Sequence, residues 1–180
     1  MEATITKTFT LEEPIEKVWA GLSNPVQISG CVPGAAITEQ IDETNYKGEV
    51  SLKFGPVKSK YDGQITIDEM DNENHTMVLK GKGLDSKGKG SAEMTMNGGA
   101  KKVDGGTEVD FKMLVNIQGT LAQIGSRLIN DVSEQLMNQF IENFKSMLAG
   151  EEFNNELKAG SMMGSVIKGM FSKKGKSADS

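Results

Sequence analysis

Apolar and polar residues alternate along two stretches of this chain, residues 3–11 and, with interruptions, residues 35–118. A period of two is typical of strands with one buried and one exposed face. Strands that follow one another with short connections predict an antiparallel meander. Turn-forming clusters divide the longer stretch into six strands; they lie at residues 42–45, 55–56, 71–74, 85–86 and 97–106.

Three segments have helical rather than strand spacing. A short helix is predicted to open at Pro14, and its apolar stripe is Ile15, Val18, Trp19 and Leu22. A second short helix or turn is predicted over residues 24–29. Near Gly119 the period changes to 3.6 and predicts one long helix that ends near Gly150. Its stripe consists of Leu121, Ile124, Leu128, Val132, Leu136, Phe140, Phe144 and Met147.

Strand alternation assigns an unusual number of glycines to the face that should lie against the long helix. Glycine weakens a strand interior, so its repetition requires an explanation. Glycines allow a sheet to coil tightly around a helix, or their missing side chains leave a hollow. Both explanations stay open for the six residues concerned: Gly48, Gly63, Gly81, Gly83, Gly88 and Gly90.

The charge of the chain is unevenly distributed. The formal net charge is −5 over 180 residues, which disfavours a nucleic-acid binder. Residues 161–180 contain four lysines and one aspartate, so they carry +3 and leave −8 for the remainder. We therefore expect an α+β domain over residues 1–150, a linker over residues 151–160 and a flexible basic tail over residues 161–180.

The basic tail has the composition of a membrane-binding segment. Apolar pairs recur every four residues, so on a helix they form one stripe flanked by lysines. We expect it to bind an anionic bilayer. Three glycines (Gly160, Gly164 and Gly169) disfavour a preformed helix, so the alternatives are folding on lipid or no folding. The residues predicted to bind the membrane are Met162, Met163, Val166, Ile167, Met170 and Phe171, with Lys168, Lys173, Lys174 and Lys176.

Other features predict where the protein works. The first residues lack the pattern of a signal peptide, and no apolar run is long enough to span a bilayer. Cys31 is the single cysteine, which fits a reducing compartment. These features and the basic tail predict a cytoplasmic protein that associates peripherally with the inner face of the cell membrane.

Residue types that support catalysis are scarce. His75 is the single histidine and is expected in an exposed turn, and Cys31 is expected to pack in the core. No spacing suggests a metal site. The glycine-rich residues 81–90 lie within two strands, whereas a phosphate loop requires glycines between a strand and a helix. Lysines on the outer sheet face form either a solvated surface or a docking surface; they are Lys53, Lys58, Lys60, Lys80, Lys82, Lys87 and Lys89.

Several local motifs together resemble one family. They are Cys31-Val32-Pro33-Gly34, the glycine-rich hairpin 81–92, Gly105-Gly106-Thr107, and the strand-to-helix crossing at 115–125. Over residues 1–150 the chain resembles the family of the carbon monoxide dehydrogenase G subunit, within the START-like (SRPBCC) helix-grip superfamily. The resemblance implies a seven-stranded antiparallel sheet curled around a long C-terminal helix, with two short helices after the first strand. It also implies a membrane-associated accessory protein, with a molybdenum hydroxylase or carbon monoxide dehydrogenase complex as partner.

We therefore expect a non-catalytic protein that holds a hydrophobic ligand, a quinone or a lipid, without a covalent cofactor, metal or nucleic acid. Two alternatives are a small enzyme of the polyketide cyclase or hydratase kind, whose polar groups would be Tyr46, Ser59 and Tyr61, and a structural adaptor with a filled core. The cavity-lining residues predicted to bind the ligand are Trp19, Phe54, Tyr61, Ile65, Met77, Leu79, Gly81, Gly83, Gly90, Met94, Phe111, Met113, Leu121, Ile124, Leu128 and Phe140.

Overall fold

The computed structural model describes residues 1–54 and 57–151, except for the side chains of Phe54 and Val57. In this part of the chain, seven antiparallel strands form one sheet in the order β1-β7-β6-β5-β4-β3-β2. The strands are β1 (Glu2–Leu11), β2 (Ala35–Gln40), β3 (Asn45–Phe54), β4 (Val57–Asp71), β5 (Thr76–Asp85), β6 (Gly90–Val103) and β7 (Gly106–Gly119). The helices are α1 (Ile15–Leu22), α2 (Pro25–Ser29), the 3-10 turn η1 (Thr120–Ile124) and α3 (Ser126–Leu148).

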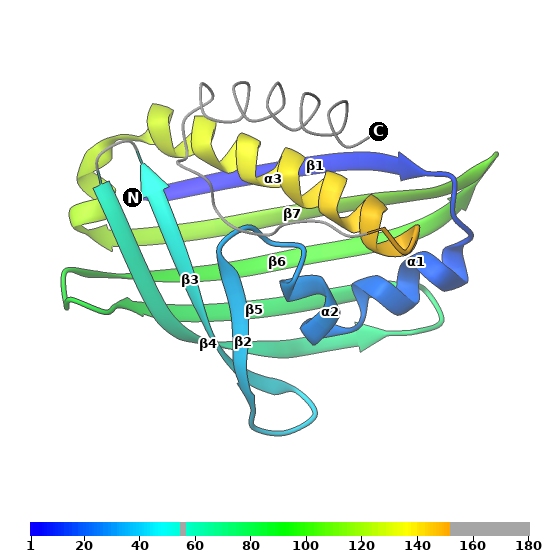
Figure 1. The fold of residues 1–180 in the computed structure, drawn as a ribbon, viewed down its shortest axis with the longest axis horizontal. Coiled ribbons are helices and arrows are strands. Elements are labelled where there is room, and N and C mark those ends of the chain that lie inside the picture. The colour runs from blue at the N-terminus through cyan, green and yellow to red at the C-terminus, as the bar shows by residue number, and fades with distance from the viewer. Residues whose placement is uncertain (55–56, 152–180) are drawn as a thin grey trace, which may run out of the picture.

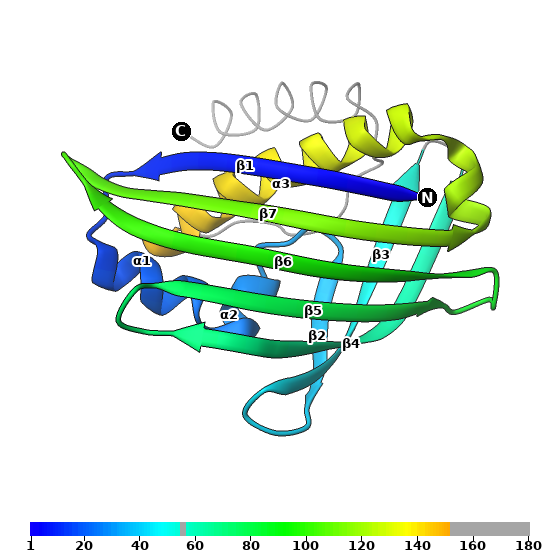
Figure 2. The same ribbon diagram turned by 180° about the vertical axis from the view of Figure 1, so that it is seen from behind.

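The helices cover one face of a strongly curved sheet. Strands β1, β7, β6, β5 and β4 run side by side, whereas β3 and β2 turn steeply across one side of them (Figure 1). Helix α3 crosses the inner face and α1 and α2 lie near its C-terminal end (Figure 1). Figure 2 shows the opposite face, over which none of the described helices lies. This arrangement confirms the predicted helix-grip fold.

Two predicted boundaries were wrong. The turn expected at residues 97–106 is shorter, because β6 continues to Val103 and pairs with β7 throughout. Strand pairing on both sides of β6 outweighs the weak strand propensity of Asn97, Gly98 and Gly99. The helix expected from Gly119 is broken at Gly125, whose φ of 101° separates η1 from α3. The predicted turn at residues 55–56 lies outside the described residues.

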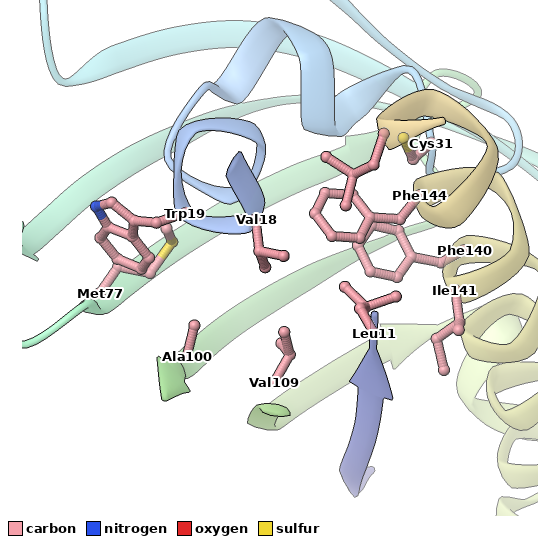
Figure 3. Packing of buried hydrophobic residues seen from close by; sticks show 11 residues of the cluster. Leu11, Val18, Trp19, Cys31, Met77, Ala100, Val109, Phe140, Ile141 and Phe144 are labelled. Carbon is pink, nitrogen blue, oxygen red and sulfur yellow. The ribbon is translucent and has the colours of Figure 1, made fainter. Parts of the chain in front are cut away.

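Aromatic rings of α3 form the centre of the larger core cluster (Figure 3). The rings of Phe140 and Phe144 are stacked with centroids 5.9 Å apart, and Phe140 packs T-shaped with Phe111 from β7, with centroids 6.4 Å apart. Val18 and Phe144 are fully buried, so α1 packs directly against α3. This contact fixes the C-terminal half of α3 over the sheet.

A buried amide adds a directional contact beside this core. Asn143 of α3 is 2 % exposed, and its Nδ2 donates to the carbonyl oxygen of Cys31 at 3.0 Å. Its Oδ1 accepts from Gln139 Nε2 at 2.9 Å. The amide therefore joins α3 to the segment between α2 and β2.

An inward charge occupies the edge strand β1. Lys7 lies on the same face as Ala3 and Leu11, which are buried, and forms a salt bridge with Glu134 of α3. This exposed pair links the N-terminal half of α3 to the edge of the sheet, and its contribution to stability is small.

The inner-face glycines serve both purposes that the sequence left open. A Cβ on Gly63 would collide with the carbonyl oxygen of Lys82 and lie 2.9 Å from Gly83 Cα, so Gly63 permits close approach of β4 and β5. A Cβ on Gly81 would lie 3.2 Å from the mobile end of Met94, at its Cε, and 3.9 Å from the carbonyl oxygen of Gln64, so Gly81 leaves space. Gly88 was wrongly placed on a strand: it lies in the β5–β6 turn with φ 71°.

Replacement of Asn143 by alanine is expected to lower the free energy of unfolding by about 1–3 kcal/mol, because the buried Cys31 carbonyl loses its donor. Asn138 lies on the exposed side of the same helix, so Asn138→Ala should change stability by less than about 0.5 kcal/mol. Urea unfolding measures the free energy of unfolding of both variants. Equal losses of stability in the two would show that the Asn143 amide has no special role.

Gly63→Ala should lower the free energy of unfolding by about 1–3 kcal/mol, since the backbones of β4 and β5 would have to separate. Gly81→Ala is the matched control, because the end of the Met94 side chain can move, and its effect should be less than about 1 kcal/mol. Thermal unfolding compares the two. Similar stabilities would contradict the assigned difference between these glycines.

Candidate ligand cavity

A cavity of about 400 Å³ lies between the inner face of the sheet and the helices. Strands β2 to β7 supply most of its wall, α1 and α2 close one side, and Met137 and Phe140 contribute from α3. The wall is almost entirely apolar. Strand alternation places the charged residues of these strands on the outer face, so the wall contains their backbone rather than their side chains.

Two core clusters stand on either side of this cavity. One contains Trp19, Phe140 and Phe144 with parts of α1. The other contains Tyr61 of β4 with Leu121 of η1 and Ile129 and Val132 of α3. Residues from both clusters line the cavity, so it separates two regions of dense packing.

Trp19 is held in place at its end of the cavity. Its Nε1 donates to Asn72 Oδ1 at 2.9 Å, and its ring lies edge-on to His75 with centroids 5.3 Å apart. His75 is half-buried and has a φ of 56°, which corrects the expectation of an exposed turn histidine. The β4–β5 turn therefore fixes Trp19 by one hydrogen bond and one ring contact.

Polar side chains contribute little to the cavity. The hydroxyls of Ser23 and Ser29 donate to the carbonyl oxygens of Trp19 and Val26, at 2.7 Å and 2.8 Å. Tyr61 is 5 % exposed and also lines the cavity. Burial, and then the negative charge of Asp85, raise the pKa of the Tyr61 phenol.

The polar groups considered for an enzyme do not converge. Tyr46 is absent from the cavity wall, and its hydroxyl contacts Gln40 Nε2 and the carbonyl oxygen of Glu43, both at 3.3 Å. Ser59 is not part of the wall either. Of the three predicted groups, only Tyr61 reaches the cavity.

Twelve of the residues selected from the sequence lie around the cavity. Whether they bind a ligand stays a prediction. They are Trp19, Tyr61, Ile65, Met77, Leu79, Gly81, Gly83, Met94, Phe111, Met113, Leu121 and Phe140.

Three selected residues do not line the cavity. Gly90 lies where β6 and β7 meet, and a Cβ there would collide with the carbonyl oxygen of Gln118. Ile124 packs at the end of η1 with the Tyr61 cluster. Leu128 is 42 % exposed, whereas Ile129 is buried. Steps of four residues advance about 40° around a helix, so the predicted stripe turns away from the core at Leu128. The side chain of Phe54 lies outside the described residues.

Some lining residues were missed because they come from short elements with little periodicity: Leu22 and Ile28 of the short helices and Ile37 of the edge strand β2. Met137 of the long helix α3 was missed as well. Met137 lies about one helical turn before Phe140 and therefore on the same face of the helix, so the sequence spacing could have identified it as a lining residue.

The thiol of Cys31 packs in the core. The residue is fully buried, and its Sγ lies 3.7 Å from both the carbonyl oxygen of Gln27 and Met147 Sδ. Burial raises the pKa of Cys31 to about 11, so the thiolate form needed by a nucleophile is disfavoured at neutral pH.

Two of the lysines predicted on the outer sheet face form salt bridges: Lys60 pairs with Glu49 and Lys80 pairs with Asp68. Within the described residues, no group of three His, Cys, Asp or Glu could hold a metal ion, and no helix is long and apolar enough to cross a membrane. The linker beyond Glu151 and the whole basic tail lie outside the described residues.

Comparisons with solved structures agree with this architecture. A conserved protein from Geobacillus kaustophilus is similar with a TM-score of 0.70 and 23 % identity, over 82 % of this chain and 96 % of that chain. The Zhui aromatase/cyclase from Streptomyces sp. R1128 has a TM-score of 0.58 and 11 % identity, over 83 % and 94 % of the two chains. Ara h 8.0201 has a TM-score of 0.56 and 14 % identity, over 84 % and 100 %. At these identities the likeness shows the fold alone.

None of the curated proteins compared with this chain matches it. A family model for the G subunit of carbon monoxide dehydrogenase (CoxG) matches residues 8–149. This match covers the sheet from within β1 and all of the described helices. It confirms the resemblance found in the sequence motifs, and a ligand-binding accessory role in general agrees with both the family and the fold. The chain belongs to the CoxG family, that of the carbon monoxide dehydrogenase G subunit.

Proposed function

We propose that this protein is a non-catalytic accessory protein that holds a quinone or a lipid in the cavity under α3. The observation that carries this proposal is an apolar space of about 400 Å³ inside the domain. Ligand cavities typically measure about 300–1,000 Å³ and have mainly hydrophobic walls. A structural adaptor would not require this space.

The chemistry of the wall favours an apolar ligand over a polar substrate. Each CH₂ group transferred from water to an apolar site contributes about 0.8 kcal/mol, so an acyl or isoprenoid chain gains affinity without specific polar contacts. A cyclase or hydratase needs acid and base groups near the reacting atoms. Tyr46 and Ser59 lie away from the cavity wall, which supports binding rather than catalysis.

The location and partner complete the proposal. The basic tail would hold the domain at the cytoplasmic face of the membrane, where quinones and lipids reside. The partner would be a molybdenum hydroxylase such as carbon monoxide dehydrogenase; the family description supports this choice. In this role the domain exchanges an apolar ligand between the bilayer and its partner.

Native mass spectrometry of the full chain purified from membranes is expected to show a lipophilic adduct. Gly81→Leu should remove most of the adduct, because the added side chain occupies the cavity beside Met94. Lys82→Leu is the matched control: Lys82 is the next residue on the same strand, and its side chain is exposed, so the adduct should persist.

Absence of any adduct, together with failure of the purified protein to bind quinones in solution, would overturn the ligand-binding proposal. An adduct retained in Gly81→Leu at the level of Lys82→Leu would place the ligand outside this cavity.

Flotation of the full chain with vesicles of phosphatidylglycerol and phosphatidylcholine tests the membrane contact. A triple change of Lys173, Lys174 and Lys176 to glutamate should weaken binding more than about 100-fold, since each lysine contributes about 1 kcal/mol near an anionic surface. The same change at Lys80, Lys82 and Lys87 is the control for the lysines of the sheet. If only this second variant loses flotation, the sheet face rather than the tail contacts the membrane.

A further inference from the structure

Among the described residues that line the cavity, Tyr61 is the one tyrosine, and few other side chains there can recognise a polar atom. Both serines in its wall already donate to carbonyl oxygens of the short helices. Glu49 pairs with Lys60 and Gln64 donates to Asn45, both on the outer side of the sheet. Tyr61 is therefore the residue whose side chain can still offer a hydrogen-bond donor to a ligand.

The hydroxyl of Tyr61 has no hydrogen-bond partner among the described residues, although the residue is only 5 % exposed. Within the same residues, no fully buried side-chain oxygen or nitrogen lacks a partner. The hydroxyl consequently borders accessible space, and Tyr61 borders the cavity. Because the hydroxyl borders accessible space, a water molecule or a ligand oxygen can accept its hydrogen bond.

The neighbouring strand leaves room beside this ring. Gly83 of β5 faces Tyr61, and a Cβ on Gly83 would lie 3.5 Å from Tyr61 Cβ and 3.8 Å from its Cδ1. The side chain of Tyr61 therefore packs beside Gly83, whose missing side chain keeps β5 from crowding the phenol.

Resting on the proposed function, we propose that the Tyr61 hydroxyl donates a hydrogen bond to a carbonyl oxygen of the bound ligand and so orients it. The ligand class is then an apolar molecule with a carbonyl-bearing head, such as a quinone, rather than a simple hydrocarbon. Its head lies at the Tyr61 and Leu121 end of the cavity, and its apolar chain extends toward Trp19 and α2. The raised pKa of Tyr61 keeps the phenol protonated at neutral pH, as a donor must be.

The test measures binding of two matched probes to the full chain by equilibrium dialysis. Menadione and 2-methylnaphthalene have the same fused rings and methyl group, but only menadione has carbonyl oxygens. Tyr61→Phe should weaken menadione binding about 3–10-fold, the value of one neutral hydrogen bond, and change 2-methylnaphthalene binding less than about 2-fold. Tyr46→Phe, which removes a hydroxyl that lies away from the cavity wall, should affect neither probe.

A second readout does not depend on affinity. Infrared spectra of bound menadione should show a carbonyl band at lower wavenumber in the natural protein than in Tyr61→Phe, because a donated hydrogen bond weakens the C=O bond. Two results would overturn the assignment of Tyr61 and leave the cavity proposal intact. One is an equal position of the carbonyl band in both proteins, and the other is an equal loss of affinity for both probes in Tyr61→Phe. If neither probe binds the natural protein and protein purified from membranes carries no lipophilic adduct, the proposed function itself fails; if an adduct is present, only the assignment of Tyr61 fails.

Discussion

The packing of α3 against the sheet at two separate places is the constraint on which the remaining structure depends. Near its C-terminus, the rings of Phe140 and Phe144 lie between α1 and β7. Near its N-terminus, Ile129 and Val132 pack with Leu121, and Lys7 joins β1 to Glu134. A rigid helix supported at both ends spans the region between them. The strands beneath that region need not fill the gap, so small residues are tolerated there and a cavity persists in a core that is otherwise closely packed.

Strand alternation made much of this cavity predictable. A residue's parity along a strand decides which face it occupies, so Tyr61, Leu79 and Met113 could be assigned to the inner face without knowledge of the register. The same reasoning could not place Gly90, because its position depends on how closely two backbones approach. The prediction for Leu128 was wrong for a different reason. Residues spaced by four rotate gradually around a helix, and the chain is interrupted at Gly125, so the face that Leu128 occupies depends on three-dimensional packing. Short elements such as α2 and β2 gave too few residues to establish a period.

The apolar wall also limits how selective the site can be. A hydrophobic pocket discriminates by volume, and one methylene group changes affinity only modestly. A site of this kind accepts a class of molecules that share a ring size and a chain, rather than one compound. Such tolerance suits a carrier whose ligand varies with the composition of the membrane, whereas an enzyme with the same wall would require further polar groups for precision.

The inward lysine of β1 has a consequence for how copies of this protein behave beside one another. An edge strand exposes unpaired backbone groups, to which a strand of another molecule can add. Natural sheets discourage such addition with inward-pointing charges, and Lys7 occupies this position on an edge strand of ten residues. A strand added at this edge would lie close to this charge, whose partner among the described residues is Glu134 of its own chain. The lysine that pairs with α3 thereby also disfavours polymerisation where the protein is crowded.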